Sequence, residues 1–372
     1  MTCNMDKLET IWDWMADEDI SMVMFEDFEP RRDTTVRWLT GQPGDALLFL
    51  SVDRKTLLMP WDTTIAKTHA VADIVVPYND FDRSPLKAIR GAVEILNIPY
   101  GSKIEIPQAT PYPVFLNYVG EISDFDIICR EQSAGDRALF RRMVKYDEEI
   151  AVLRKAADIT NKIIDILEKK VRSGKIKTEA DAALLIEVEA RKRGCEGTGF
   201  ETLAAGPDRS FGIHAFPAWT GGPFATQGLS ILDFGLRYQG YNTDVTLTFV
   251  RDPSPQQQKM VSLVETAAEI AKRSLVPERD TLFTWYIVET YFAKAKKKMV
   301  HGLGHGIGLD VHEHPFFRKR GKSEWDQLLP GMVFAIEPGL YDPMHGGCRL
   351  ENDFLMTEDG YEVLTEARII RL

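Results

Sequence analysis

The first third of the chain alternates short apolar runs with turn residues. Three of these runs are continuous enough to predict buried strands: residues 21–25, 46–52 and 56–59. Two further segments carry apolar residues at helical spacing: 7–15 and 85–96. Because strands and helices alternate along the sequence, residues 1–144 are predicted to form an α/β domain.

From residue 145 onward the pattern is that of longer amphipathic helices. Apolar residues recur at helical spacing between residues 150 and 171, which predicts one long helix with a single buried face. Capping signals mark three more helix starts: Thr178 with Asp181, Ser254 with Gln257, and Asp280. Apolar hairpins lie between and after these helices. Residues 145–372 are therefore predicted to form an α+β domain in which helices pack on a mostly antiparallel sheet.

The composition is that of an ordinary globular protein with an excess of acidic residues. Its formal net charge of −11 disfavours binding to nucleic acid or to an anionic membrane. No apolar run approaches the roughly 18 residues of a membrane span, and the acidic N-terminus lacks the pattern of a secretory signal. The four cysteines are far apart and form no CxxC pair: Cys3, Cys129, Cys195 and Cys348. We therefore expect reduced thiols and a cytoplasmic protein.

Residues 231–249 predict a strand, a tight turn and a second strand, with one acid on each strand. If the turn is centred near Tyr238-Gln239, Asp233 and Asp244 lie directly opposite each other on one face, with β-carbons about 4.5–5.5 Å apart. Two carboxylates at that distance raise each other's pKa unless cations lie between them. An exposed hairpin with two unrelated acids is the alternative, which the apolar neighbours in both strands disfavour.

Three of the seven histidines fall close together, at His301, His305 and His312. The His-x3-His spacing resembles a helical metal-binding pair, but four glycines within residues 302–308 argue against a helix. A glycine-rich track instead lets the backbone and a substrate approach closely. A structural role is the better interpretation of any one of these histidines alone, whereas the cluster favours a functional site.

Two more carboxylates occupy strand positions near the C-terminus. Glu337 ends an apolar strand before Pro338-Gly339, and Glu351 shares one strand face with Arg349 and Asp353 by period-two alternation. A solvated charged face is the alternative for that second strand. Together the motifs provide four carboxylates, one imidazole and no thiolate. This donor set suits two divalent ions and does not suit a structural zinc site.

In this order, the motifs resemble those of the metallopeptidases that include Xaa-Pro dipeptidases (prolidases), aminopeptidase P and methionine aminopeptidase. That family shares the pita-bread fold, and the resemblance covers roughly residues 145–372. The N-terminal stretch, including residues 36–41, is similar to the creatinase-like domain of the Xaa-Pro branch, which methionine aminopeptidases generally lack. The resemblance implies an α+β pita-bread catalytic domain preceded by a smaller α/β creatinase-like domain.

The resemblance also implies a dinuclear metal centre. Asp233 would bind one metal ion through both oxygens, while Asp244 and Glu351 would bridge the two ions. His305 and Glu337 would complete the coordination of the second ion. Manganese is the expected metal, with cobalt, zinc and iron as alternatives.

Further residues would act on the substrate by the same resemblance. Glu337 would double as the proton shuttle, and His312 would hydrogen-bond the tetrahedral intermediate. His214 matches a histidine that approaches the substrate. Three more residues would face the substrate or support the ligands: His301, Arg349 and Tyr341.

The implied activity is hydrolysis of the Xaa-Pro bond in dipeptides or short peptides by a homodimeric, dinuclear metallopeptidase. Arg318 is predicted to bind the free carboxylate of a dipeptide, since an arginine fork grips a carboxylate in two places. If residues 316–322 instead form a solvated basic loop, an aminopeptidase P that acts on longer peptides is the alternative. A metal-free hydrolase resembling creatinase and a binding protein without catalysis are further alternatives, which the complete ligand set disfavours.

Overall fold

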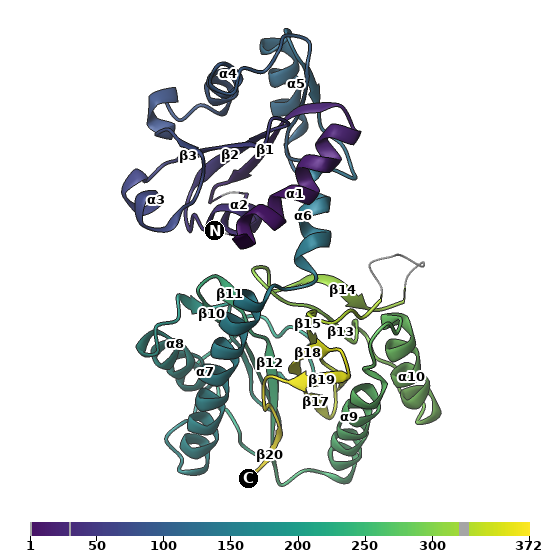
Figure 1. Ribbon diagram of the computed structural model, residues 1–372. Helices are drawn as coiled ribbons and strands as arrows, with labels where there is room; N and C mark the ends of the chain where they lie inside the picture. The colour runs from purple at the N-terminus through teal and green to yellow at the C-terminus, as the bar shows by residue number, and fades with distance from the viewer. Residues whose placement is uncertain (1, 30, 320–326) are drawn as a thin grey trace. The chain divides into compact units, whose positions relative to one another are not determined.

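The computed structural model describes residues 2–29, 31–319 and 327–372, and contacts within it divide the chain into two compact units. The first unit comprises Met1–Arg142 and the second Met143–Leu372. Figure 1 shows the helices and strands of each unit. None of the helices in those described ranges has the length and hydrophobicity needed to cross a lipid bilayer.

The first unit is built on a six-stranded mixed sheet with the strand order β4-β3-β2-β1-β5-β6. The strands span Ile20–Asp27 (β1), Ala46–Ser51 (β2), Lys55–Pro60 (β3), Ile74–Val75 (β4), Lys103–Glu105 (β5) and Asp126–Ile128 (β6). Strands β1, β2 and β3 form an antiparallel meander, and the other three strands pair in parallel. The three strands predicted for this part of the chain are thus confirmed as β1, β2 and β3.

Helices pack against this sheet. They span Thr2–Asp17 (α1), Thr34–Thr40 (α2), Thr63–His69 (α3), Pro85–Ile95 (α4), Tyr112–Glu121 (α5) and Ala134–Arg142 (α6), with a 3-10 helix at Tyr78–Phe81 (η1). Ile89 and Val93 of α4 belong to the same apolar core as Met22, Leu47 and Leu57 of the sheet. The two predicted helices correspond to α1 and α4.

The second unit contains four long helices among its described residues, and they begin where the sequence signals predict. They span Asp147–Arg172 (α7), Glu179–Lys192 (α8), Pro255–Ser274 (α9) and Thr281–Lys294 (α10). Thr178 and Ser254 form capping boxes at the starts of α8 and α9, and Asp280 accepts a hydrogen bond from the backbone N–H of Leu282 at the start of α10. In Figure 1, α7 and α8 lie on one side of the strands and α9 and α10 on the other.

The strands of the second unit form two main sheets, with orders β20-β12-β9-β8 and β14-β13-β15-β18-β19. Smaller ladders join β11-β10-β7 and β16-β17. The bounds are Gly197–Thr198 (β7), Leu203–Ala205 (β8), Gly228–Phe234 (β9), Leu236–Tyr238 (β10), Tyr241–Asn242 (β11), Val245–Arg251 (β12), Gly304–Gly306 (β13), Glu313–Phe317 (β14), Val333–Ile336 (β15), Gly339–Asp342 (β16), Gly346–Arg349 (β17), Asn352–Thr357 (β18), Gly360–Val363 (β19) and Ile369–Arg371 (β20). Strands β12 and β20 are parallel and the other pairs are antiparallel, as expected for the α+β domain.

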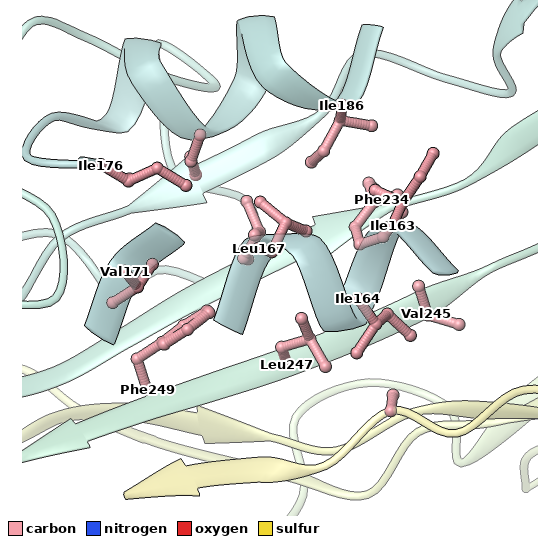
Figure 2. Packing of buried hydrophobic residues seen from close by; sticks show 14 of the residues in the cluster. Ile163, Ile164, Leu167, Val171, Ile176, Ile186, Phe234, Val245, Leu247 and Phe249 are labelled. Carbon is pink, nitrogen blue, oxygen red and sulfur yellow. The ribbon is translucent and has the colours of Figure 1, made fainter. Parts of the chain in front are cut away.

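One apolar core joins α7 to strands β9 and β12. The side chains that α7 contributes point toward the strands in Figure 2: Ile163, Ile164, Leu167 and Val171. The strands contribute Phe234, Val245, Leu247 and Phe249. Since successive side chains of a strand point to opposite faces, the packing of Phe234 and Val245 against α7 directs Asp233 and Thr246 to the other face of the sheet.

Leu167→Ala should lower the free energy of unfolding by about 2–5 kcal/mol, because the side chain is fully buried and its loss leaves a cavity. Urea unfolding followed by circular dichroism measures this change. Lys169→Ala, on the exposed face of the same helix, is the matched control and should stay within about 0.5 kcal/mol of the parent. Equal losses in the two variants would contradict the assigned core.

Candidate metal centre

The hairpin that carries the first two acids has a different register from the one predicted. Tyr238 pairs with Tyr241, so the turn is Gln239-Gly240, one residue later than expected. Both turn residues have positive φ, 48° and 86°, as a tight two-residue hairpin requires. Asp233 therefore lies opposite Thr246, and the expectation that it lies directly opposite Asp244 is wrong. The shift is two residues, so Asp244 keeps the same face as Asp233.

The remaining predicted ligands come from three other places in the second unit. His305 is the central residue of β13, and Glu337 directly follows β15. Glu351 lies between β17 and β18 and forms an isolated bridge with Thr246 of β12. Donor atoms of these residues and of the hairpin acids lie within 4.8 Å of one another in three overlapping groups: Asp244, His305 and His312; His305, Glu337 and Glu351; Asp233, Asp244 and Glu351. The structure thus brings the five predicted ligands together.

The ring of His305 is oriented for binding a metal. Its Nδ1 lies 3.0 Å from the backbone carbonyl oxygen of Gly306, which can only accept a hydrogen bond. The proton is therefore on Nδ1, and the lone pair of Nε2 faces Asp244 Oδ2 at 3.6 Å and Glu351 Oε1 at 4.0 Å. Burial lowers the pKa of His305 to about 3, with a further contribution from His312. The imidazole is neutral at physiological pH, as a metal ligand must be.

The carboxylates show the electrostatic cost of gathering like charges inside a protein. Burial, followed by repulsion from Asp233, raises the pKa of Glu351 to about 8 in the metal-free protein. Burial and repulsion from Glu351 raise the pKa of Asp244 and that of Glu337 well above their ordinary values. Among the described residues, Oδ1 of Asp233 is buried and has no hydrogen-bond partner. A buried carboxylate oxygen that accepts no hydrogen bond has its lone pairs available to coordinate a metal ion.

The charges around the centre match two divalent ions. Four buried acids and one half-buried acid surround one buried guanidinium, that of Arg349, so the group carries a formal charge of −4 when all are ionised. The buried acids are Asp233, Asp244, Glu351 and Asp353, and the half-buried one is Glu337. Ionised carboxylates are rarely buried without compensating positive charge. Two divalent cations would supply +4, so the residues present fit the metal pair that the sequence predicts.

Arg349 and Asp353 hold the ligands from behind. Arg349 is 2% exposed, and its Nη2 donates to Oδ2 of Asp233 at 2.5 Å. Its Nε donates to Thr246 Oγ1 at 2.9 Å and its Nη1 to the hydroxyl of Tyr341 at 2.7 Å. Asp353 Oδ2 accepts a hydrogen bond of 3.1 Å from the backbone N–H of Asp244. Through these hydrogen bonds Arg349 orients Asp233, and it also lines the cavity described below, so its contact with a substrate stays a prediction.

Tyr341 belongs to the same supporting layer. Its hydroxyl accepts from Arg349 and lies 3.0 Å from Nε2 of His301, whose Nδ1 lies 2.6 Å from the carbonyl oxygen of Gly302. The carbonyl again fixes the proton on Nδ1, so Tyr341 donates to Nε2 of His301. Burial lowers the pKa of His301 to about 4. Tyr341 therefore positions His301, which does line the cavity described next.

A cavity of about 510 Å³ opens over the metal ligands. His214, His301 and His312 line it, and the rings of His305 and His312 meet edge to face at 4.2 Å. Sequence reasoning missed several residues that line its walls: Phe200, Glu201, Leu203, Ile213 and Phe216. The pairing of β8 with β9, which places Leu203 opposite Asp233, explains part of this wall and leaves no local signal in the sequence. A mostly apolar cavity with a few polar groups is typical of a site for a small ligand.

Arg318 does not line this cavity. It is exposed, and its guanidinium carbon lies 4.6 Å from the centre of the Phe316 ring. Arg318 therefore packs on an aromatic neighbour without lining the cavity, and its binding of a substrate carboxylate stays a prediction. Arg320 and Lys322 of the same predicted loop lie outside the described residues.

Helices packed on antiparallel sheets around a buried carboxylate–histidine cluster define a metallopeptidase of the pita-bread fold. A prolidase from Pyrococcus horikoshii OT3 has the same fold with a TM-score of 0.81, at 24% identity over 98% of this chain and 99% of that one. An X-Pro aminopeptidase from Thermotoga maritima MSB8 has a TM-score of 0.82 at 24% identity, with the same coverage of both chains. At this level of identity the likeness shows the fold.

The sequence also identifies the family. The pattern of metallopeptidase family M24 matches residues 151–358, more than half of the chain, and the chain belongs to this family. An Xaa-Pro dipeptidase from Pyrococcus furiosus is 32% identical over 233 residues, which cover 60% of this chain and 64% of that relative. The chain thus matches slightly less than two thirds of the length of this curated relative.

Asp244→Ala should reduce the bound metal with little loss of fold, because Asp244 takes part in two of the three donor groups. Elemental analysis of the purified variant measures metal per chain, and circular dichroism checks the fold. Asp359→Ala, at an exposed acid in the last hairpin, is the control and should keep the parent's metal content. Full metal occupancy in Asp244→Ala would contradict the ligand assignment.

The metal-free protein should lose stability as pH rises from about 6.5 to 8. In this window Glu351, with a pKa of about 8, keeps a proton that the unfolded chain has released, so the folded state is increasingly disfavoured. Below pH 6.5 the lowered pKa values of His301 and His305 act in the opposite sense. The loss expected from Glu351 alone is about 2 kcal/mol.

Urea unfolding at pH 6.5, 7.2 and 8.0, after dialysis against a chelator, measures this loss. Added Mn²⁺ should abolish it, since a cation stabilises the ionised carboxylates. A metal-free protein whose stability stays constant or rises across this window would contradict the assigned cause.

Proposed function

We propose that this chain hydrolyses the Xaa-Pro bond of dipeptides or short peptides with two divalent metal ions. The observation that carries the proposal is the convergence of Asp233, Asp244, His305, Glu337 and Glu351 on one buried centre at the base of a cavity. Manganese is the proposed metal and a homodimer the proposed assembly. We propose residues 145–372 as the catalytic domain and residues 1–144 as a creatinase-like domain that precedes it.

When bound, the two ions supply Lewis-acid activation of a water molecule and of the scissile carbonyl group. The protein's own residues handle the proton and the developing charge. Glu337 has a raised pKa caused by burial, which suits a group that accepts a proton and passes it to the leaving nitrogen. His312 lines the cavity beside His305 and would donate a hydrogen bond to the developing oxyanion. His214, on the cavity wall, would contact the substrate.

The choice of a proline substrate follows from the chemistry of the amide. The nitrogen of an Xaa-Pro bond carries no hydrogen, so a peptidase that anchors its substrate through that N–H cannot use it. The five proposed ligands would hold metal ions whose Lewis-acid chemistry acts on the carbonyl group and needs no N–H. The Xaa-Pro dipeptidase from Pyrococcus furiosus, which matches 60% of this chain, supports the same substrate class.

An aminopeptidase P-like activity on longer peptides is the second candidate. The observation that favours it is the position of Arg318, which is exposed, stacks on Phe316 and does not line the cavity. A dipeptidase needs a cation that binds the free carboxylate directly after proline. If Arg318 does not bind that carboxylate, a peptide that continues past the proline forgoes no contact that a dipeptide would make.

His312→Ala should lower kcat by about 10²–10³-fold, the usual effect of losing one donor to an oxyanion. Its metal content should stay at the parent level, since the five proposed ligands remain. Steady-state kinetics on an Xaa-Pro dipeptide, together with elemental analysis, separates the two effects. A variant that loses metal along with activity would show that His312 is itself a ligand.

Arg318→Ala tests the length of the substrate. If Arg318 binds the free carboxylate, the variant should lose about 1.5–3 kcal/mol of dipeptide binding, seen as a higher KM, and C-terminally amidated dipeptides should be unaffected. Lys319→Ala, at the next exposed position, is the matched control. Equal rates on Xaa-Pro and Xaa-Pro-Xaa, with no effect of Arg318→Ala, would favour the aminopeptidase P-like activity.

A further inference from the structure

We propose that Lys145 positions His312 for catalysis, acting through a buried ion pair with Glu313. The inference rests on the proposed function, because it assigns a cause to the orientation of a proposed oxyanion donor. Lys145 lies 168 residues before Glu313 in the sequence, and none of the motifs includes it.

The ion pair is short and almost fully removed from solvent. Lys145 Nζ lies 2.5 Å from Glu313 Oε1, and the two side chains are 2% and 4% exposed. Lys145 is itself held in place by its backbone, whose N–H donates to the carbonyl oxygen of Gly331 at 2.9 Å, and its Nζ also lies 3.3 Å from the carbonyl oxygen of Met143. The ammonium group therefore has a fixed position, and Glu313 is drawn to it.

Glu313 lies at an irregularity in the backbone pairing between β13 and β14. His305 of β13 pairs with Phe316 of β14, but the next residue, Gly306, pairs with Glu313, so the register shifts by two residues between them. His312 directly precedes this irregular step. Regular strand pairing therefore does not fix the position of His312. The side-chain contacts of Glu313, the next residue, must help to fix it.

Gly308, in the glycine-rich segment 302–308, leaves the space that the Glu313 carboxylate occupies. A β-carbon at Gly308 would lie only 2.5 Å from Oε1 of Glu313, so the carboxylate occupies space that any other residue at 308 would fill. Oε1 of Glu313 is thus close to both Lys145 Nζ and the backbone at Gly308. The residue before it, His312, is then directed to the cavity, where its ring meets that of His305 at 4.2 Å.

Removing Lys145 takes away the cation nearest a buried carboxylate. Such a carboxylate must move toward solvent or take up a proton, because a buried charge is costly without a partner. Either response changes the position of the adjacent His312. A displacement of about 1 Å at a reacting group can cost on the order of 10²-fold in rate, so a small shift is enough.

Four variants test the link: Lys145→Met, Lys145→Met/Glu313→Gln, His312→Ala and Lys145→Met/His312→Ala. Each is assayed as the full-length, Mn²⁺-loaded protein for kcat and KM on an Xaa-Pro dipeptide, for metal content and for thermal unfolding. We expect Lys145→Met to lower kcat by about 10–100-fold, the range known for residues that orient a metal site from behind, with KM and metal content near those of the parent. The charge-neutral double variant should recover most of this loss, because no unpaired charge remains.

The comparison of His312→Ala with Lys145→Met/His312→Ala tests most directly whether Lys145 acts through His312. If Lys145 acts through His312, adding Lys145→Met to His312→Ala should lower kcat no further, since interacting residues are not additive. Multiplying losses would overturn the proposal, as would a Lys145→Met variant with the parent's kcat. A purely structural role would instead lower the unfolding temperature and leave kcat of the folded protein unchanged.

Two further measurements keep the outcome unambiguous. Arg154→Met breaks an exposed ion pair with Glu362, at 2.6 Å with side chains 52% and 39% exposed, and should leave kcat unchanged. If Lys145→Met does not fold, Glu313→Gln, which keeps the side-chain shape, tests the same link and should lower kcat; an unchanged kcat there overturns the proposal. A parent protein that cleaves no Xaa-Pro substrate would refute the proposed function itself. An active parent whose kcat is unchanged by Lys145→Met would refute only the role of Lys145.

Discussion

Mutual repulsion among buried carboxylates is the constraint on which the second unit depends. Asp233, Asp244, Glu337 and Glu351 are drawn together in the protein, where burial and mutual repulsion raise the pKa values of Asp244, Glu337 and Glu351 and where one guanidinium cannot balance the charges. Such a cluster persists only if rigid elements hold the acids and if cations enter. The strands supply the first condition, and membership of a metallopeptidase family agrees with the second.

Rigid placement comes from strand geometry together with helix packing. The helix α7 buries one face of β9 and β12, so alternation turns the acids of those strands to the opposite face. Arg349 then holds Asp233 through a buried hydrogen bond, and Tyr341 holds His301 through a partly buried one. A proposed metal ligand and a cavity histidine are thus each held by a second residue. Precise sites are commonly built in this layered way.

Local signals made much of this structure predictable. Thr178, Ser254 and Asp280 cap helices where the sequence indicates, because capping depends on residues only three positions apart. The five proposed ligand residues are recognisable in the sequence because their types and order are distinctive. The hairpin register was mispredicted by one position in the turn, since Gln239 adopts a positive φ that its residue type does not signal. The partnership of Lys145 with Glu313 and the pairing of β8 with β9 join distant segments, and no local pattern reports them.

The bridge between Thr246 and Glu351 joins the two main sheets at the position where the ligands meet. Thr246 Oγ1 donates to Glu351 Oε2 at 2.7 Å, and the backbone N–H of Glu351 donates to the carbonyl oxygen of Thr246 at 3.2 Å. The proposed ligands lie on both sides of this bridge, so bound metal would cross-link the two sheets and offset the repulsion between their carboxylates. Amide hydrogens of β12 and β18 would then exchange with solvent as one cooperative block in the loaded protein and as two separate blocks once the ions are removed.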